Sequence, residues 1–138
     1  MPPQDREHCV TGEAATLRGR RNLVVEDDYL LAQVLTDFLE QADFHVVGPV
    51  GSLEEALALV ENEPGSFDGA ILDINLHGSN SYPVADALVA RSIPFLFATG
   101  YGRDALEGRY RDHPRCEKPF DQATLLSMFG ALFNNRAA

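Results

Sequence analysis

The stretch Ala70-Ile71-Leu72-Asp73-Ile74-Asn75 places a carboxylate directly after a short apolar run. Turn-forming sequences bound it, at residues 67–69 before it and 77–80 after it. This pattern predicts a buried β-strand that leads into a loop, with Asp73 at the carboxyl end of the strand. In an open α/β sheet, ligands bind at that end of the strands. Asp73 is therefore either a functional carboxylate or an aspartate that caps the next helix.

Strand and helix patterns alternate along the chain from residue 22 onward. Short apolar runs predict five strands, and apolar residues at helical spacing predict helices between them. Ser52 and Glu55 form a capping box, which predicts where the second helix begins. The alternation predicts a doubly wound α/β fold, with a five-stranded parallel sheet of flavodoxin-like order 2-1-3-4-5 between two layers of helices. The expected strands are residues 22–25, 45–50, 70–72, 94–98 and 115–117, and the expected helices are residues 29–42, 53–60, 83–90 and 121–133.

The connection between the fourth and fifth strands is short. Only 18 residues separate Thr99 from Lys118. Glycine and proline are poor helix formers, and this segment contains Gly100, Gly102, Gly108 and Pro114. We therefore expect a shortened or irregular fourth helix of low local stability.

Length and composition predict one domain. The chain has 138 residues, 45% of them hydrophobic, which is enough for a substantial core. Residues 1–21 are polar and lack periodicity, so we expect a disordered N-terminal extension followed by a folded domain at residues 22–138. No apolar run approaches the about 18 residues needed to cross a bilayer, and the sequence has no signal-peptide pattern. With only two cysteines, the expected location is cytoplasmic, without a membrane partner.

Charge is distributed unevenly along the chain. Residues 1–21 carry four arginines and three acidic residues, whereas residues 22–138 carry 7 basic and 18 acidic residues, a net charge of −11. Such an acidic domain repels phosphate backbones, and the sequence has no basic stripe. We therefore expect no nucleic-acid partner.

Three acidic residues, Glu26, Asp27 and Asp28, directly follow the first strand. In the predicted strand order, they reach the same edge of the sheet as Asp73. Carboxylates that converge on one crevice raise one another's pKa unless a cation lies between them, and such oxygen ligands suit Mg²⁺ or Ca²⁺ rather than zinc. The alternative is a helix amino terminus stabilised by acidic side chains.

A hydroxyl and an ammonium are expected at that edge as well. Thr99 ends the fourth strand, and Lys118, the only lysine of the chain, follows the fifth. A compact ammonium suits a single phosphoryl oxygen, although most lysines are solvated surface residues. The combination of acids, threonine and lysine is much more specific than any one of them.

These residues lie in motifs that resemble those of the receiver domain of two-component response regulators, over residues 22–135. The matching stretches are residues 23–28 (LVVEDD), 71–73 (ILD), 98–100 (ATG) and 117–120 (EKPF). Residues 94–101 (PFLFATGY) further resemble the signature of a single-domain subfamily known by the phrase FAT GUY, common in alpha-proteobacteria. That subfamily tends to have a shortened or disordered fourth helix.

The resemblance implies a signalling role. Asp73 would accept a phosphoryl group from a sensor histidine kinase, with Thr99 and Lys118 contacting that group. The domain would not be an enzyme beyond Mg²⁺-dependent self-phosphorylation and autodephosphorylation. It would relay the signal by binding a downstream protein or act as a phosphate sink for a shared kinase. The alternative is an interaction module that binds metal but does not switch.

The resemblance also implies the metal ligands. Asp27 and Asp73 would hold Mg²⁺ directly, Glu26 would do so through water, and the backbone carbonyl of Asn75 would complete the protein ligands. Ca²⁺ or Mn²⁺ could substitute for Mg²⁺.

The sequence departs from the family pattern at two places. Arg115 stands where the family usually has its switch aromatic, so Tyr101 is the substitute candidate, with an ordinary loop aromatic as the alternative. The loop after Asp73 lacks the proline that is frequent in the family.

Competing sites are weaker. His113 and Cys116 have a ligand-like spacing and could form a zinc set with His8 and Cys9, although a disordered tail supplies poor ligands. Asp73 also resembles the nucleophile of phosphatases that form a phosphoaspartate, but their second acid two residues later is absent.

Overall fold

The computed structural model describes residues 18–99, 106, 108–118 and 121–137. Its main sheet has five parallel strands in the order β2-β1-β3-β6-β7, so the predicted strand order is confirmed. The strands are β1 (Arg21–Val25), β2 (His45–Val50), β3 (Gly69–Asp73), β6 (Phe95–Thr99) and β7 (Arg115–Glu117).

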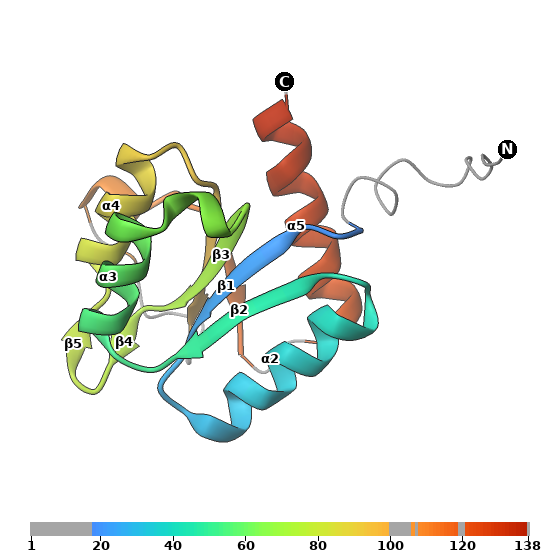
Figure 1. The fold of residues 1–138 in the computed structure, drawn as a ribbon, viewed down its shortest axis with the longest axis horizontal. Coiled ribbons are helices and arrows are strands. Elements are labelled where there is room, and N and C mark those ends of the chain that lie inside the picture. Colours follow the sequence, from blue (N-terminus) through green and yellow to red (C-terminus); the bar gives the residue numbers. More distant parts are fainter. Residues whose placement is uncertain (1–17, 100–105, 107, 119–120, 138) are drawn as a thin grey trace, which may run out of the picture.

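The described residues form four α-helices, which cover the two faces of the sheet (Figure 1). They are α2 (Tyr29–Gln41), α3 (Leu53–Asn62), α4 (Tyr82–Ala90) and α5 (Gln122–Ala137). Helices α3 and α4 lie on one side of the sheet, and α2 and α5 lie on the other. The doubly wound α/β class predicted from the sequence is therefore confirmed.

Alternating residues of the strands build the two halves of the core. Leu23 and Leu72 point toward α3 and α4, whereas their neighbours Val24 and Ile71 pack with Phe129 of α5. This follows from the period of two residues in a strand, which sends successive side chains to opposite faces. Because β1 and β3 are buried on both faces, their sequences are continuous apolar runs rather than alternating patterns.

Side-chain caps fix where two of the helices begin. The Ser52 hydroxyl accepts a hydrogen bond from the Glu55 N–H at 3.1 Å, as the capping box predicts. Asp28 caps α2 in the same way, with its carboxylate accepting from the Leu31 N–H at 3.1 Å. These caps satisfy N–H groups that have no partner within the helix.

A small hairpin after β3 was not predicted. It consists of β4 (Asn75–Leu76) and β5 (Ser79–Asn80), joined by His77 and Gly78. Two-residue strands are too short to show a periodic pattern, so the sequence indicated only a loop here.

The structure describes only part of the connection between β6 and β7, residues 106 and 108–114. Among its described residues, the helical part is the 3-10 helix η3 (Gly108–Tyr110). A second 3-10 helix, η2 (Pro64–Ser66), precedes β3. The short η3 agrees with the expected shortened fourth helix.

The first described residues pack on the sheet. Gly19 N–H donates to the Asp43 carbonyl at 2.8 Å, and His45 N–H donates to the Arg20 carbonyl at 2.9 Å.

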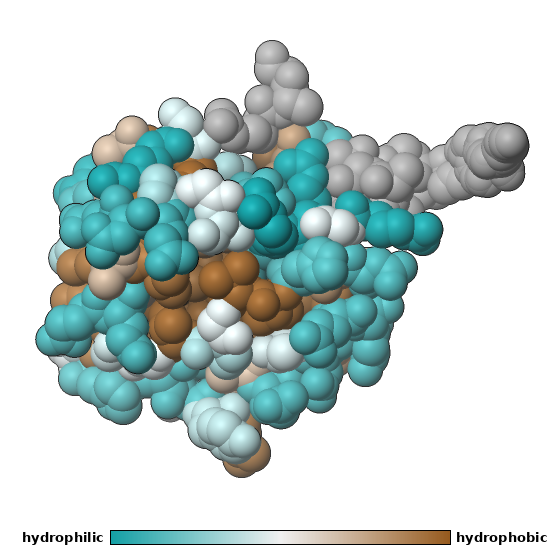
Figure 2. Space-filling model, viewed as in Figure 1, coloured by the Kyte–Doolittle hydropathy of each residue, from teal (hydrophilic) through white to brown (hydrophobic). Residues whose placement is uncertain are grey.

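On the face shown in Figure 2, hydrophobic side chains gather over β2, between α2 and α3, and hydrophilic residues surround them. None of the described helices combines the length and apolar character needed to cross a membrane.

Candidate functional site

Two neighbouring strands bring three carboxylates together. β1 ends at Val25, directly before Glu26 and Asp27, and β3 ends on Asp73 itself. Val25 pairs with Leu72 in the parallel register, so the acids leave the sheet at the same edge. Oxygen atoms of Glu26, Asp27 and Asp73 all lie within 4.8 Å of one another. Among the described residues, this is the one group of three or more potential metal ligands.

Lys118 completes the charged cluster from the other side. It follows β7, and its N–H donates to the Thr99 carbonyl at 2.8 Å. Its Nζ lies 3.0 Å from Glu26 Oε1 and 3.3 Å from Asp73 Oδ1. Only 16% of the Lys118 side chain is exposed, so this ammonium is largely removed from water.

The environment shifts the pKa values of the buried acids. Burial and the nearby charge of Asp73 raise the pKa of Glu26 to about 7. Burial also raises the pKa of Asp73, although Lys118 opposes that shift. The pKa of Lys118 is raised because the attraction of Asp73 and Glu26 outweighs its own desolvation. A cation that binds beside these carboxylates therefore lowers the free energy of the site, because it offsets their mutual repulsion.

Asp27 is held differently from the other two acids. Its Oδ2 accepts a hydrogen bond from the His77 main-chain N–H at 2.8 Å. Burial opposes ionisation, but this bond and the contact with Asp73 together lower the pKa of Asp27. Asp27 is thus favoured as a carboxylate, the form that binds a metal.

Thr99 places a buried hydroxyl at the end of β6, and the residue is 1% exposed. Its Oγ1 has no hydrogen-bond partner among the described residues. A buried hydroxyl without a partner costs free energy, so an incoming acceptor at this position would be stabilised.

The remaining predicted residues have mixed placements. Asn75 begins β4, and its main-chain nitrogen lies 3.5 Å from Asp73 Oδ1, so its main chain runs beside the Asp73 carboxylate. Asp28, in contrast, caps α2, while its N–H donates to Glu26 Oε2 at 3.1 Å. Tyr101 lies outside the described residues.

The donor set fits a hard divalent cation. Three carboxylates supply oxygen ligands, the kind that Mg²⁺ prefers, and they converge from two strand ends. The raised pKa of Glu26 also indicates that the lysine alone does not offset all of the buried negative charge.

The two described residues of the alternative zinc set, His113 and Cys116, have other contacts. The His113 ring nitrogen Nε2 lies 2.9 Å from the Phe95 carbonyl oxygen, and the ring stacks on Phe95. Cys116 is buried in the other half of the core, with a thiol pKa raised by burial to about 11. His8 and Cys9 lie outside the described residues.

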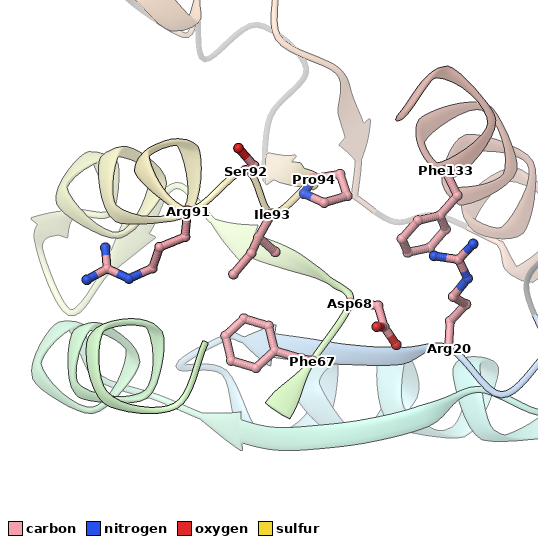
Figure 3. Close-up of a pocket in the computed structure, with 8 residues that line it drawn as sticks. All are labelled: Arg20, Phe67, Asp68, Arg91, Ser92, Ile93, Pro94 and Phe133. Carbon is pink, nitrogen blue, oxygen red and sulfur yellow. The ribbon is translucent and has the colours of Figure 1, made fainter. Parts of the chain in front are cut away.

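A pocket of about 250 Å³ lies at the opposite edge of the sheet, where β3 and β6 begin (Figure 3). Phe67 and Ile93 point toward its centre, and Arg20 stacks on the Phe133 ring at 4.5 Å. Its one carboxylate, Asp68, is paired with Arg21. The carboxylate cluster at the other edge is therefore the site with reactive chemistry.

Sequence reasoning missed the role of His77 and a cluster on the α4 side. There, Arg109 and the Tyr110 hydroxyl both bond Asp86, at 2.6 Å. The His-Gly pair at 77–78 was a turn signal, whereas nothing local marked a contact between residues 24 positions apart.

This chain is similar to known proteins over most of its length. The model of the response regulator receiver domain family matches residues 23–129. The transcriptional regulatory protein PdtaR of Mycobacterium tuberculosis is 28% identical over 104 residues, which cover 74% of this chain and 49% of that protein. The chain thus spans about half the length of the curated relatives it matches.

Two solved structures are similar as well. SdrG of Sphingomonas melonis Fr1 is 46% identical, with a TM-score of 0.74, and the match covers 83% of this chain and 97% of that one. The response regulator PhyR of Brucella abortus is 29% identical, with a TM-score of 0.77, covering 94% of this chain and 54% of that one.

Proposed function

Because this chain belongs to the response regulator receiver domain family, we propose that it accepts a phosphoryl group on Asp73 from a sensor histidine kinase. One observation carries the proposal. Asp73 stands at the end of β3, with the Lys118 ammonium 3.3 Å from one of its oxygens and two further carboxylates within 4.8 Å. Receiver domains are signalling domains rather than classical enzymes, so the proposed output is a change in binding.

The proposed transfer would use side chains at this edge of the sheet together with Mg²⁺ and the phosphohistidine of the kinase. An Asp73 oxygen forms a bond to phosphorus while the phosphorus–nitrogen bond of phosphohistidine breaks. The electron pair of that bond returns to the imidazole, and the product on this chain is an acyl phosphate. Lys118 is positioned to offset negative charge on the transferred group, as such transfers require.

Glu26, Asp27, Asp73 and the Asn75 carbonyl would hold Mg²⁺ in this proposal. The ion would supply charge neutralisation for the phosphoryl oxygens. Asp27 would be ionised before the metal binds, because the hydrogen bond from the His77 N–H lowers its pKa. Lys118 keeps the Glu26 and Asp73 carboxylates together.

Thr99 is the proposed first element of the readout. Its unpartnered hydroxyl would bond a phosphoryl oxygen on Asp73, which lies on the neighbouring strand, in register with Ala98. The shift of Thr99 would then change the start of the β6–β7 connection. The receiver domain, predicted at residues 22–138, would act in the cytoplasm with an N-terminal extension before it. Arg21 already begins β1, so the end of the predicted extension at residue 21 belongs to the fold. A downstream protein would bind the changed surface, or the domain would act as a phosphate sink.

The test is phosphoryl uptake from acetyl phosphate with Mg²⁺. Intact-mass measurement should show one phosphoryl group that hydroxylamine removes. Asp73→Asn should abolish the uptake and preserve the fold, because the volume hardly changes. Asp28→Asn is the matched control, since asparagine also caps a helix and this side chain lies outside the cluster. Uptake that persists in Asp73→Asn would contradict the proposal. Mg²⁺ binding without uptake in the wild type would instead support a non-switching metal-binding module.

A further inference from the structure

The hairpin between β4 and β5 makes a specific contact with the acid cluster. The pairs Asn75–Asn80 and Leu76–Ser79 leave His77 and Gly78 as a two-residue turn. Both have positive φ, +49° and +85°, as the common type I′ hairpin turn requires. This backbone directs the His77 N–H onto Asp27 Oδ2, at 2.8 Å, across 50 residues of sequence.

The base of the hairpin is anchored in the fold. Leu76 is 2% exposed and packs in the core beside α3 and α4. The Ser81 N–H donates to the Ile74 carbonyl at 2.8 Å, and the Tyr82 N–H donates to the Asn80 side chain at 2.7 Å. The turn therefore extends from a fixed base and ends on the carboxylate.

We propose that this hairpin positions Asp27 for the cation, with the main-chain N–H of His77 as the positioning group. The inference rests on the proposed function, because it concerns the cation site of that reaction. Asp27 lies two residues after the end of β1, and 21% of its side chain is exposed. Since the hairpin engages Oδ2, it holds the carboxylate in one orientation beside Glu26 and Asp73.

The His77 imidazole has a lesser part in the proposal. Its Nδ1 lies 3.5 Å from the same Oδ2, but 71% of the side chain is exposed. An exposed pair of this kind contributes little. The turn backbone, rather than the imidazole, is therefore assigned the positioning role.

Two substitutions separate the backbone from the imidazole. Gly78→Val places a β-branched residue at φ +85°, which L-residues strongly disfavour, so the turn should change. Loss of a group that orients a metal ligand typically weakens metal binding by about 10- to 100-fold. We expect Gly78→Val to weaken Mg²⁺ binding by about 10-fold. His77→Gly keeps the N–H and favours positive φ, so it should change binding by less than about 2-fold.

Gly19→Val is the matched control for strain. Gly19 has φ +81°, and a Cβ added there would meet no atom within 4 Å, as at Gly78, but Gly19 lies where the chain enters β1 at the other edge. The substitution should lower the melting temperature about as Gly78→Val does and leave Mg²⁺ binding unchanged. Binding is followed by calorimetric titration of the full chain, and folding by circular dichroism.

The outcomes distinguish this inference from the proposed function. If folded Gly78→Val binds Mg²⁺ as tightly as the wild type, the hairpin proposal fails while phosphoryl uptake by the wild type can still stand. If His77→Gly loses as much affinity as Gly78→Val, the imidazole rather than the turn holds Asp27, and the proposal is overturned. If the wild type takes up no phosphoryl group, the proposed function fails, and the binding comparison still decides the role of the hairpin.

Discussion

The ammonium of Lys118 lies 3.3 Å from Asp73 Oδ1, and it contacts Glu26 Oε1 at 3.0 Å as well. One cation therefore holds two buried carboxylates together. Burying two carboxylates costs free energy. The pairing with Lys118 offsets that cost, whereas an unpaired buried charge destabilises a protein strongly.

Lys118→Met should test this pairing, because methionine keeps most of the volume and removes the charge. We expect phosphoryl uptake to fall by at least about 10-fold, since no other side chain among the described residues of the cluster can offset the charge of the transferred group. Stability should fall by about 3–5 kcal/mol in urea unfolding, the usual cost of leaving buried charges without their partner. Lys118→Arg restores the charge and should recover part of the stability. Unchanged uptake in Lys118→Met would contradict the assignment.

His113 predicts a dependence of stability on pH. Burial lowers its pKa below the usual 6.5, with the Arg115 charge acting in the same direction and the Phe95 carbonyl opposing it. The unfolded chain therefore binds a proton near pH 6.5 before the folded protein does. The contribution of neutral His113 to the free energy of unfolding is therefore fully present above that pH, and it is lost as the pH falls below about 6.5.

The measurement is urea unfolding between pH 7.5 and 5.5 for the wild type and for His113→Phe, which keeps a ring against Phe95. The difference in unfolding free energy between the two proteins should grow in favour of the variant as the pH falls. A difference that is constant over this range would show that His113 titrates alike in both states.

Tyr110 ties the β6–β7 connection to α4. Its ring is 4% exposed and packs beside Phe97 and Tyr82, with ring centroids 5.5 and 5.1 Å apart, while its hydroxyl bonds Asp86. Tyr110→Phe should cost about 0.5–1.5 kcal/mol, the usual net value of one hydrogen bond. Tyr110→Ala should cost about 3–5 kcal/mol, because the packing is lost as well. Arg109→Ala removes an exposed ion pair and should lower the free energy of unfolding much less than Tyr110→Ala does. Equal losses for the first two variants in urea unfolding would exclude a packing role.

Much of this fold followed from the sequence, for identifiable reasons. β3 and β6 are continuous apolar runs because both faces of the sheet are covered, and such runs are visible in the sequence. The carboxyl ends of parallel strands share one edge, so placing Asp73 at the end of one strand and Lys118 directly after another also placed them at the same edge.

Other features depend on contacts that no local pattern encodes. Asp28 has the same chemistry as Asp27, and only the helix geometry assigns one to the cap of α2 and the other to the cluster. The bond between Tyr110 and Asp86 joins two surfaces that meet only after α4 packs on the sheet. α5 continues to Ala137, beyond the expected end at Phe133, because helical hydrogen bonds persist where the apolar pattern stops.

Thr99 offers the sharpest test of the proposed readout. Its hydroxyl is buried and has no hydrogen-bond partner in the part of the chain that the structure describes. Thr99→Val replaces it by a methyl group of similar shape and keeps the β-branched character that suits β6. Removal of an unsatisfied buried hydroxyl should leave stability unchanged or raise it by up to about 1 kcal/mol.

The same change should nevertheless abolish the response to phosphorylation. In the wild type, treatment with acetyl phosphate and Mg²⁺ should increase amide-exchange protection over residues 108–113, because Thr99 moves toward the phosphoryl group and reorders the connection that follows it. Thr99→Val should still take up the phosphoryl group on Asp73, more slowly, but its exchange should not change in that segment. Thr99→Ser keeps the hydroxyl and is the matched control, expected to retain the response. A full exchange response in Thr99→Val would show that the signal leaves Asp73 by another route.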